Sequence, residues 1–167
     1  MNRRKILVAG LFLPLEGLAQ ACGAPTPRQT EGPFFKTESP KRTSLLEKDA
    51  KSRLILTGTV LSSQCKPVPN ALLDFWHADE AGEYDNRGYR YRGHQFADAQ
   101  GRYRLETILP AEYPGRARHI HVKVQAPGRR ILTTQVYFPG DASNRRDGLY
   151  RPELEMKNGE FNFVVAA

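Results

Sequence analysis

The chain is poor in cysteine and in long hydrophobic runs, and both scarcities exclude classes of protein. Two cysteines among 167 residues are too few for a disulfide-dense miniprotein or for a structural zinc site built from thiolates. The apolar run at residues 6–15 has ten residues, whereas a bilayer-spanning helix needs about 20, and no later stretch approaches that length. We therefore expect no transmembrane anchor. An apolar fraction of 40% with 14 glycines and 12 prolines argues against disorder or a coiled coil and indicates one turn-rich domain.

The first 21 residues have the pattern of a secretory signal peptide. Basic residues 3–5 precede the apolar run, and Ala-Gln-Ala at 19–21 has the small-x-small form that signal peptidase cuts. Arg3 and Arg4 also fit a twin-arginine export signal, and two arginines in an ordinary basic region explain them equally well. We predict an exported protein, periplasmic or secreted, without residues 1–21.

Export bears on the two cysteines, because exported chains live in an oxidising compartment. Cys22 and Cys65 are an even number, so we predict a disulfide between them that ties down the N-terminal arm; two unpaired thiols are the alternative. Because Cys22 directly follows the cleavage site, a lipid anchor at this cysteine is another alternative. This alternative is less favoured, since the residue three positions earlier, usually aliphatic in lipoproteins, is Ala19.

The net charge of +7 first suggests a polyanionic partner such as nucleic acid. Removal of residues 1–21 leaves 22 basic and 17 acidic residues, a net charge of +5. A nucleic-acid surface needs clustered Lys and Arg with interleaved aromatic residues, and only residues 84–92 offer a weak version of it. Because the export signal also argues against it, we expect no nucleic-acid partner.

The pattern of the chain changes near residue 50. Residues 22–50 are rich in Pro, Thr, Ser and Lys without a period, whereas residues 51–167 contain short alternating runs separated by turn residues. We predict an all-β fold, a mostly antiparallel β-sandwich over 51–167 with an extended N-terminal arm (22–50) and few short helices. Strands are expected at 53–61, 70–77, 102–109, 118–126, 130–138 and 160–165, and short helices at 45–51 and around 153–156.

The densest chemistry lies in one of these strands, at His119 and His121. Residues two apart on a strand project from the same face, so the two imidazoles point together while Ile120 and Val122 point into the opposite layer. Such a pair suits adjacent positions around one metal ion. The alternative is two surface histidines on an edge strand.

The spacing does not decide which residues would complete a metal site. Carboxylates would suit a hydrolytic zinc site or a facial Fe(II) triad, while the cysteines are too few for a structural zinc site. Two tyrosines, Tyr84 and Tyr113, lie in loops beside strand ends. Taken singly, each is more typical of a packing or hydrogen-bonding residue.

Six short motifs follow one another in a fixed order along the chain. They are WHAD (76–79) with GEY (82–84), GRYR (101–104), ILP (108–110), YPGR (113–116), HIH (119–121) and LTTQ (132–135). In this order they resemble the intradiol ring-cleavage dioxygenases, a family that includes protocatechuate 3,4-dioxygenase and catechol 1,2-dioxygenase. An upstream segment, TEGPFF at 30–35, resembles an arm motif of the protocatechuate branch. The resemblance covers nearly the whole chain after residue 21, and six blocks in one order are far more specific than any single block.

The resemblance implies a mononuclear, non-haem Fe(III) held by Tyr84, Tyr113, His119 and His121. Fe(III) favours anionic oxygen and lowers the pKa of a bound phenol, so two phenolates and a hydroxide would balance its charge beside two neutral imidazoles. The implied substrates are a small catechol and O2, with cleavage between the two hydroxylated carbons to a muconate-type diacid. By the same resemblance Tyr113 is the tyrosine that leaves the metal when substrate binds, and Arg116 and Gln135 act in catalysis, Arg116 by stabilising negative charge on the ring.

The competing interpretation is a non-catalytic exported β-sandwich binding module that retains the metal scaffold. Loss of a metal ligand would favour it, yet all four positions are filled. The chain also departs from the larger enzymes: Tyr113 and His119 are only six residues apart, and the helical N-terminal dimerisation segment of the catechol branch is missing. We expect a compact enzyme with a more open site, and the sequence leaves the oligomeric state open, a homo-oligomer included.

The position of Gln135 depends on the turn near Pro127 and Gly128. A two-residue loop would place Gln135 opposite Ile120 and away from the histidines, whereas a three-residue loop would place it opposite His121. We predict the odd-length loop.

Other candidates receive ordinary structural interpretations. We expect His77 to be packed or hydrogen-bonded, Tyr103 to lie in the core, and His94 to be exposed in a loop from Asp85 to Gln95 that could cover the pocket. Candidate substrate-wall residues are Trp76, Tyr89 and Tyr91.

Overall fold

The structure, a computed structural model, describes residues 23–167. The predicted signal peptide and Cys22 lie outside these residues, so export and the Cys22–Cys65 disulfide stay predictions. Within the described part of the chain no helix is long and apolar enough to cross a membrane.

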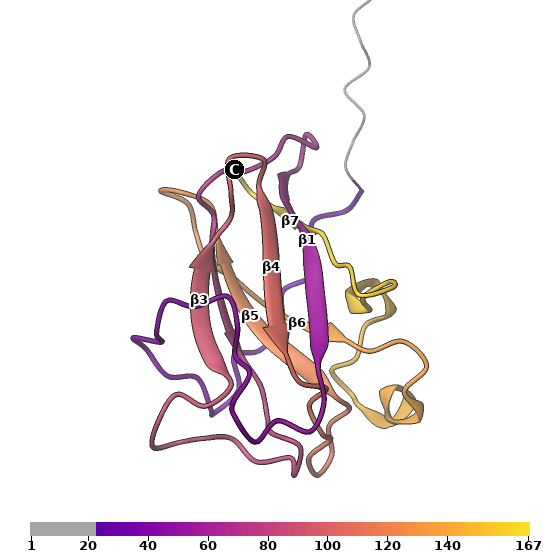
Figure 1. Ribbon diagram of the computed structural model, residues 1–167. Coiled ribbons are helices and arrows are strands. Elements are labelled where there is room, and N and C mark those ends of the chain that lie inside the picture. Colours follow the sequence, from indigo (N-terminus) through magenta and orange to yellow (C-terminus); the bar gives the residue numbers. More distant parts are fainter. Residues whose placement is uncertain (1–22) are drawn as a thin grey trace, which may run out of the picture.

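Two β-sheets face each other and enclose the core (Figure 1). Among the strands described, all pairings are antiparallel except that between β1 and β7. The predicted all-β, mostly antiparallel sandwich is therefore confirmed. One sheet has the order β4-β1-β7, with β1 Leu54–Ser62, β4 Arg102–Thr107 and β7 Phe163–Val165; the other has the order β3-β2-β5-β6, with β2 Leu72–Trp76, β3 Arg92–Phe96, β5 His119–Gln125 and β6 Leu132–Tyr137.

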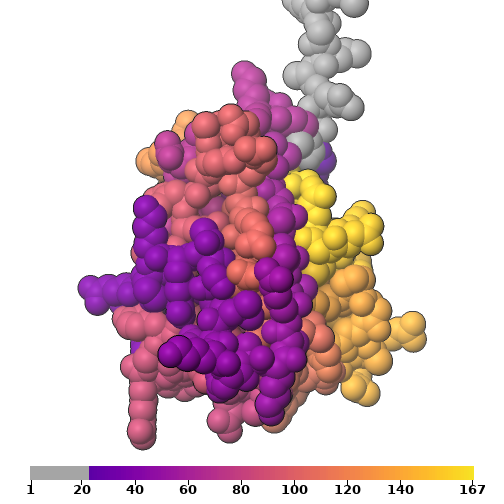
Figure 2. Space-filling view, in the orientation of Figure 1, coloured from indigo at the N-terminus to yellow at the C-terminus, as the bar shows by residue number. Residues whose placement is uncertain are grey.

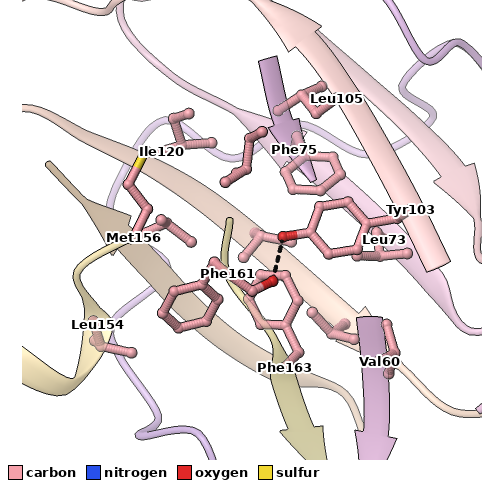
Figure 3. Packing of buried hydrophobic residues seen from close by; sticks show 14 of the residues in the cluster. Val60, Leu73, Phe75, Tyr103, Leu105, Ile120, Leu154, Met156, Phe161 and Phe163 are labelled. Atoms are coloured by element: carbon pink, nitrogen blue, oxygen red, sulfur yellow. Dashed lines mark hydrogen bonds between the residues drawn. The ribbon is translucent and has the colours of Figure 1, made fainter. Parts of the chain in front are cut away.

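Alternation along the strands produces the core between the sheets. On β5, Ile120, Val122 and Val124 are fully buried there, as expected from their spacing. Figure 3 shows aromatic rings at the centre of this core, where the Tyr103 hydroxyl donates a hydrogen bond of 2.8 Å to the carbonyl of Phe161. The predicted core position of Tyr103 is confirmed.

Ile120→Val is expected to lower the free energy of unfolding by about 1 kcal/mol, because it removes one methylene from a fully buried position. Chemical denaturation of the metal-free protein measures the change. Ile131→Val is the matched control, since Ile131 is 40% exposed and should lose almost nothing. Equal losses at both positions would contradict this account of the core.

Strand β3 was not anticipated, because residues 85–95, which include most of it, were expected to form a loop. Gly93 lies inside β3, and an added Cβ there would come within 2.8 Å of the side chains of Arg42 and Leu45 in the arm. The glycine is therefore needed for close approach of another segment, a requirement that local propensity does not show. His94, expected to be exposed, is half-buried on this strand, and its Nδ1 lies 2.7 Å from the carbonyl oxygen of Ser39.

The short helices also differ from the expected ones. Residues 45–51 form no helix; instead Leu45 is fully buried and its N–H donates to the Glu106 carbonyl at the edge of β4. A 3₁₀ turn, η2 Pro152–Leu154, lies where a short helix was expected around 153–156, and a second, η1 Ala142–Arg146, was not anticipated.

The N-terminal arm hydrogen-bonds in turn to each of the four strands that form the sheet edges in the described chain. Thr26 pairs with Val164 of β7, and the Gln29 N–H donates to the carbonyl of Thr133 on β6. Residues 40–42 then bond to His94 of β3, and Leu45 bonds to the edge of β4. The arm therefore crosses the outer face of the larger sheet between residues 29 and 40, because β6 and β3 are its opposite edges. Figure 2 shows the near side of the molecule, where indigo and violet atoms lie beside β3 and over the lower front.

Candidate metal centre

The two histidines of β5 point together on the outer face of the larger sheet. Their Nε2 atoms are 3.0 Å apart, and both rings are buried. His119 Nδ1 lies 2.6 Å from the Ala117 carbonyl oxygen, which can only accept, so Nδ1 carries the proton and Nε2 offers its lone pair to the site. Burial, reinforced by Arg116, lowers the pKa of His119 to about 4, and burial also places the pKa of His121 well below its usual value. Both imidazoles are thus neutral and able to bind a cation.

The two loop tyrosines meet these histidines. Tyr84 lies between β2 and β3, and Tyr113 between β4 and β5; their ring centroids are 5.8 Å apart. The Tyr113 ring lies 5.8 Å from His119 and the Tyr84 ring 6.2 Å from His121. All four side chains that the sequence nominated are therefore brought to one place.

Glycine holds the two tyrosine loops together. Gly82 has φ of +83°, and a Cβ there would lie 2.4 Å from the carbonyl oxygen of Glu112. The Ala111 N–H donates to the carbonyl of Asp79, which joins the same two loops. A side chain at position 82 would separate Tyr84 from Tyr113.

The donor set fits a ferric ion. Tyr84 Oη is buried and has no hydrogen-bond partner within residues 23–167, and the same is true of His121 Nδ1. Burial, with Tyr113 as the next cause, raises the pKa of Tyr84, so the phenol ionises only if a cation compensates it. No group of three or more His, Cys, Asp or Glu side chains in the described chain could hold a metal. A metal here would therefore need the phenol oxygens, which suit a hard trivalent ion.

The arm covers this cluster where it crosses β5 and β2. The Phe34 ring stacks on Tyr84 at 4.4 Å between centroids, and Trp76 stacks on His121 at 4.8 Å. Gly32, with φ of +71°, lies so close that an added Cβ would be 3.5 Å from His121 Cε1. The site is covered by its own chain, and the TEGPFF segment was the sequence signal that could have placed Phe34 there.

Arg116 lies beside the cluster at the centre of a polar network. Its Nη1 donates to Tyr113 Oη at 3.2 Å, while Nη2 donates to Gln135 Oε1 and, at 3.0 Å, to Tyr137 Oη. Gln135 pairs with His121 across β5 and β6, with three residues in the turn, so the predicted register is confirmed. Burial alone would lower the pKa of Arg116, but Tyr137 and Asp147 outweigh it and raise the pKa, which keeps the guanidinium charged.

Two members of this network were not singled out from the sequence. Tyr137 follows Gln135 by two residues on β6 and so shares its face, a signal that alternation could have provided. Asp147 comes from the loop after η1, and nothing in the local sequence links it to Arg116.

The remaining candidates lie around the site in structural roles. His77 is buried, with Nε2 2.7 Å from Thr107 Oγ1 and Nδ1 2.7 Å from the Ala78 carbonyl, which confirms its expected role. Tyr91 stacks on His77, and Tyr89 donates to the Thr37 carbonyl. Trp76 alone among the three wall candidates contacts one of the four clustered side chains, His121.

A cavity of about 440 Å³ opens beside the cluster. Its lining includes Tyr113, Arg116, Arg146 and Asp147. The cavity brings solvent, or a small molecule, to the Tyr113 and Arg116 side of the cluster.

The fold and cluster define a class of protein: an antiparallel β-sandwich whose larger sheet carries a buried group of two imidazoles and two phenols on its outer face.

Comparison with known proteins identifies the family. The family model described as Dioxygenase matches residues 30–151. Catechol 1,2-dioxygenase of Acinetobacter baylyi is 33% identical over 155 residues, covering 75% of this chain and 50% of that protein. The protocatechuate 3,4-dioxygenase beta chain of Burkholderia cepacia is 36% identical over 118 residues, covering 59% and 50%. The chain belongs to the intradiol ring-cleavage dioxygenase family, and it spans about half the length of these curated relatives.

Solved structures agree with this assignment. The dioxygenase domain of a dioxygenase carbohydrate-binding protein fusion from Streptomyces sp. SirexAA-E superposes with a TM-score of 0.83 at 49% identity, covering 86% of this chain and 99% of that one. The 3-chlorocatechol 1,2-dioxygenase of Rhodococcus opacus superposes with a TM-score of 0.78 at 27% identity, covering 84% and 72%.

Proposed function

We propose that this protein is an exported, Fe(III)-dependent intradiol dioxygenase. It inserts both atoms of O2 into a small catechol and cleaves the ring between the two hydroxylated carbons, giving a muconate-type diacid. The observation that carries the proposal is the convergence of two neutral imidazoles and two phenols at a buried point where Tyr84 Oη has no hydrogen-bond partner within residues 23–167. Curated relatives named catechol and hydroxyquinol 1,2-dioxygenase support the substrate class.

The metal would be held by Tyr84, Tyr113, His119 and His121. Bound Fe(III) would supply Lewis acidity that promotes loss of both catechol protons, and the resulting dianion is electron-rich toward O2. The histidines contribute neutral donors, because burial keeps them unprotonated.

The chain's other residues manage protons, charge and water. A catechol that binds as a dianion must release two protons. We assign one to the Tyr113 phenolate oxygen, 3.2 Å from the guanidinium of Arg116, and the other to the hydroxide that would balance the charge of the metal. Arg116 stands beside the cavity, where its charge stabilises negative charge that develops on the ring. Phe34 and Trp76 exclude water from the faces of Tyr84 and His121 on which they stack.

The test is the visible spectrum of the iron-loaded protein, followed by mass analysis of the product formed under ¹⁸O2. We expect a burgundy phenolate-to-iron band and a diacid that carries two ¹⁸O atoms. Catechol, protocatechuate and hydroxyquinol form the substrate panel. Protein that stays colourless after iron loading and opens none of these rings would favour a binding module instead.

Mass analysis of the exported protein tests the export signal. We expect the mature chain to begin at Cys22.

A further inference from the structure

We propose that Asp147 is a positioning residue whose carboxylate holds both the Arg116 guanidinium and the peptide that orients His119. The inference rests on the proposed function, in which Arg116 is the catalytic cation. Asp147 acts through its neighbours and is therefore not itself a catalytic residue.

The Asp147 side chain, 1% exposed, has both oxygens occupied. Arg116 Nε donates to Oδ1 at 3.1 Å and to Oδ2 at 3.0 Å. The Ala117 N–H donates to Oδ2 at 3.0 Å, and the Leu149 N–H donates to Oδ1 at 2.9 Å. Four bonds to one buried carboxylate leave it a single orientation, and the bond from Leu149 fixes it to its own loop.

Because of the geometry of arginine, the bonds from Asp147 to Nε also fix the direction of the other two guanidinium nitrogens. A guanidinium is planar with five donors in a fixed fork, so holding Nε determines where Nη1 and Nη2 point. Here they point to Tyr113 Oη, Gln135 and Tyr137. Without Asp147, Arg116 keeps its charge but loses the contact that sets the plane of the fork.

The same carboxylate acts on the main chain next to the metal ligands. Asp147 accepts the N–H of Ala117, and the carbonyl of Ala117 lies 2.6 Å from His119 Nδ1. That contact keeps the proton on Nδ1 and leaves Nε2 bare for a metal. One side chain thus links the cation and a histidine ligand, although it is remote from both in sequence.

A neighbouring ion pair lacks the hydrogen bonds of the Asp147 pair: within residues 23–167 its facing atoms, Arg118 Nε and Asp141 Oδ2, have no hydrogen-bond partner. Asp141 lies just before η1 and faces Arg118 at 3.6 Å, and Arg118 is 39% exposed. The side chain of Asp141 caps the Ser143 N–H, a bond that asparagine also makes. Asp141→Asn is therefore a matched control for Asp147→Asn. Both substitutions replace an aspartate beside η1 by asparagine, and both aspartates face an arginine next to the site.

The experiment compares Asp147→Asn, Arg116→Met and the double variant as iron-loaded proteins, with kcat, KM and iron content measured separately. We expect Asp147→Asn to lower kcat roughly 10–100-fold, as is typical for residues that support a metal site, with KM changed much less. In the Arg116→Met background it should lower kcat less than about twofold further, because the arginine is gone and the asparagine oxygen can still accept the Ala117 N–H. Asp141→Asn should stay within about twofold of the unchanged protein.

A readout independent of catalysis uses the metal-free protein. The Nε–H of Arg116 should exchange slowly in a nitrogen-15 spectrum and lose this protection in Asp147→Asn but not in Asp141→Asn. If Asp147→Asn does not fold, Asp147→Glu replaces it, since it keeps the charge but moves the oxygens, and a fall in kcat with retained iron is again expected.

The outcomes separate the inference from the proposed function. If the unchanged protein is active and Asp147→Asn keeps its full kcat, the positioning role alone is overturned. The same holds if the losses of the two single variants multiply in the double variant. Unchanged protein that carries iron and opens no catechol ring overturns the proposed function and the inference together.

Discussion

Tyr84→Phe is expected to remove iron binding and colour while making the metal-free protein more stable. The substitution deletes only the hydroxyl, which is buried without a hydrogen-bond partner in residues 23–167. An unsatisfied buried polar group costs about 1–3 kcal/mol, so its loss should raise the free energy of unfolding of the metal-free form. Loss of a supporting residue already weakens metal sites roughly 10–100-fold, and loss of a ligand oxygen should cost at least as much.

Tyr103→Phe provides the matched control for this result. Its hydroxyl is also buried, but it donates to the Phe161 carbonyl in the core. Deleting it leaves that carbonyl unpaired, so stability should fall by about 1–3 kcal/mol while iron binding and colour persist. Denaturation of both metal-free variants, with iron titration followed at the visible band, measures the contrast. A metal-free Tyr84→Phe that is less stable, or one that keeps the band, contradicts a ligand role for Tyr84.

Arg116→Met is expected to lower kcat roughly 10²–10³-fold while the protein keeps its iron and colour. That loss is typical when a preorganised group stabilising transition-state charge is removed from a water-poor site. Methionine retains much of the side-chain volume beside Tyr113 and Tyr137 but none of the charge. Single-turnover kinetics on iron-loaded protein separate the loss of chemistry from weaker substrate binding.

The substitution also affects the fold, so the measurement must allow for it. Asp147 would be left as a buried carboxylate without its arginine, a change that typically costs about 3–5 kcal/mol. Rates are therefore compared per folded, iron-containing protein. Arg118→Met, at the half-exposed arginine two residues away, is the control and should stay within about twofold. A kcat for Arg116→Met within tenfold of the unchanged protein would remove Arg116 from the mechanism.

Strand alternation made part of the site predictable. The order His119, Ile120, His121, Val122 puts the imidazoles on one face as soon as the segment is a strand, because the side-chain period of a strand is two. Gln135 needed one further condition, an odd-length turn, and the observed pairing with His121 meets it. The two tyrosines were assigned by resemblance and motif order, since a loop residue has no periodicity from which its direction can be inferred.

The arm shows what local patterns could not reveal. Residues 22–50 have no period and were expected only as an extended segment, yet their backbone bonds to the edges of both sheets. Where the arm bonds depends on which strands end up at the edges, a property of the assembled sheets. Strand β3 was missed for a related reason, because Gly93 is favoured there by contact with the arm and disfavoured by strand propensity.

The sequence alone therefore established the sandwich, the shared face of the two histidines and the motif order that nominated all four clustered side chains. Folding decided that Phe34 covers Tyr84, that Arg116 faces Tyr113, and that Asp147 holds Arg116 from 31 residues away. The physical reason is the distance along the sequence over which each kind of interaction acts. Alternation and turn chemistry act over a few residues, whereas covering a metal site and anchoring a buried cation require contacts between segments that only packing brings together.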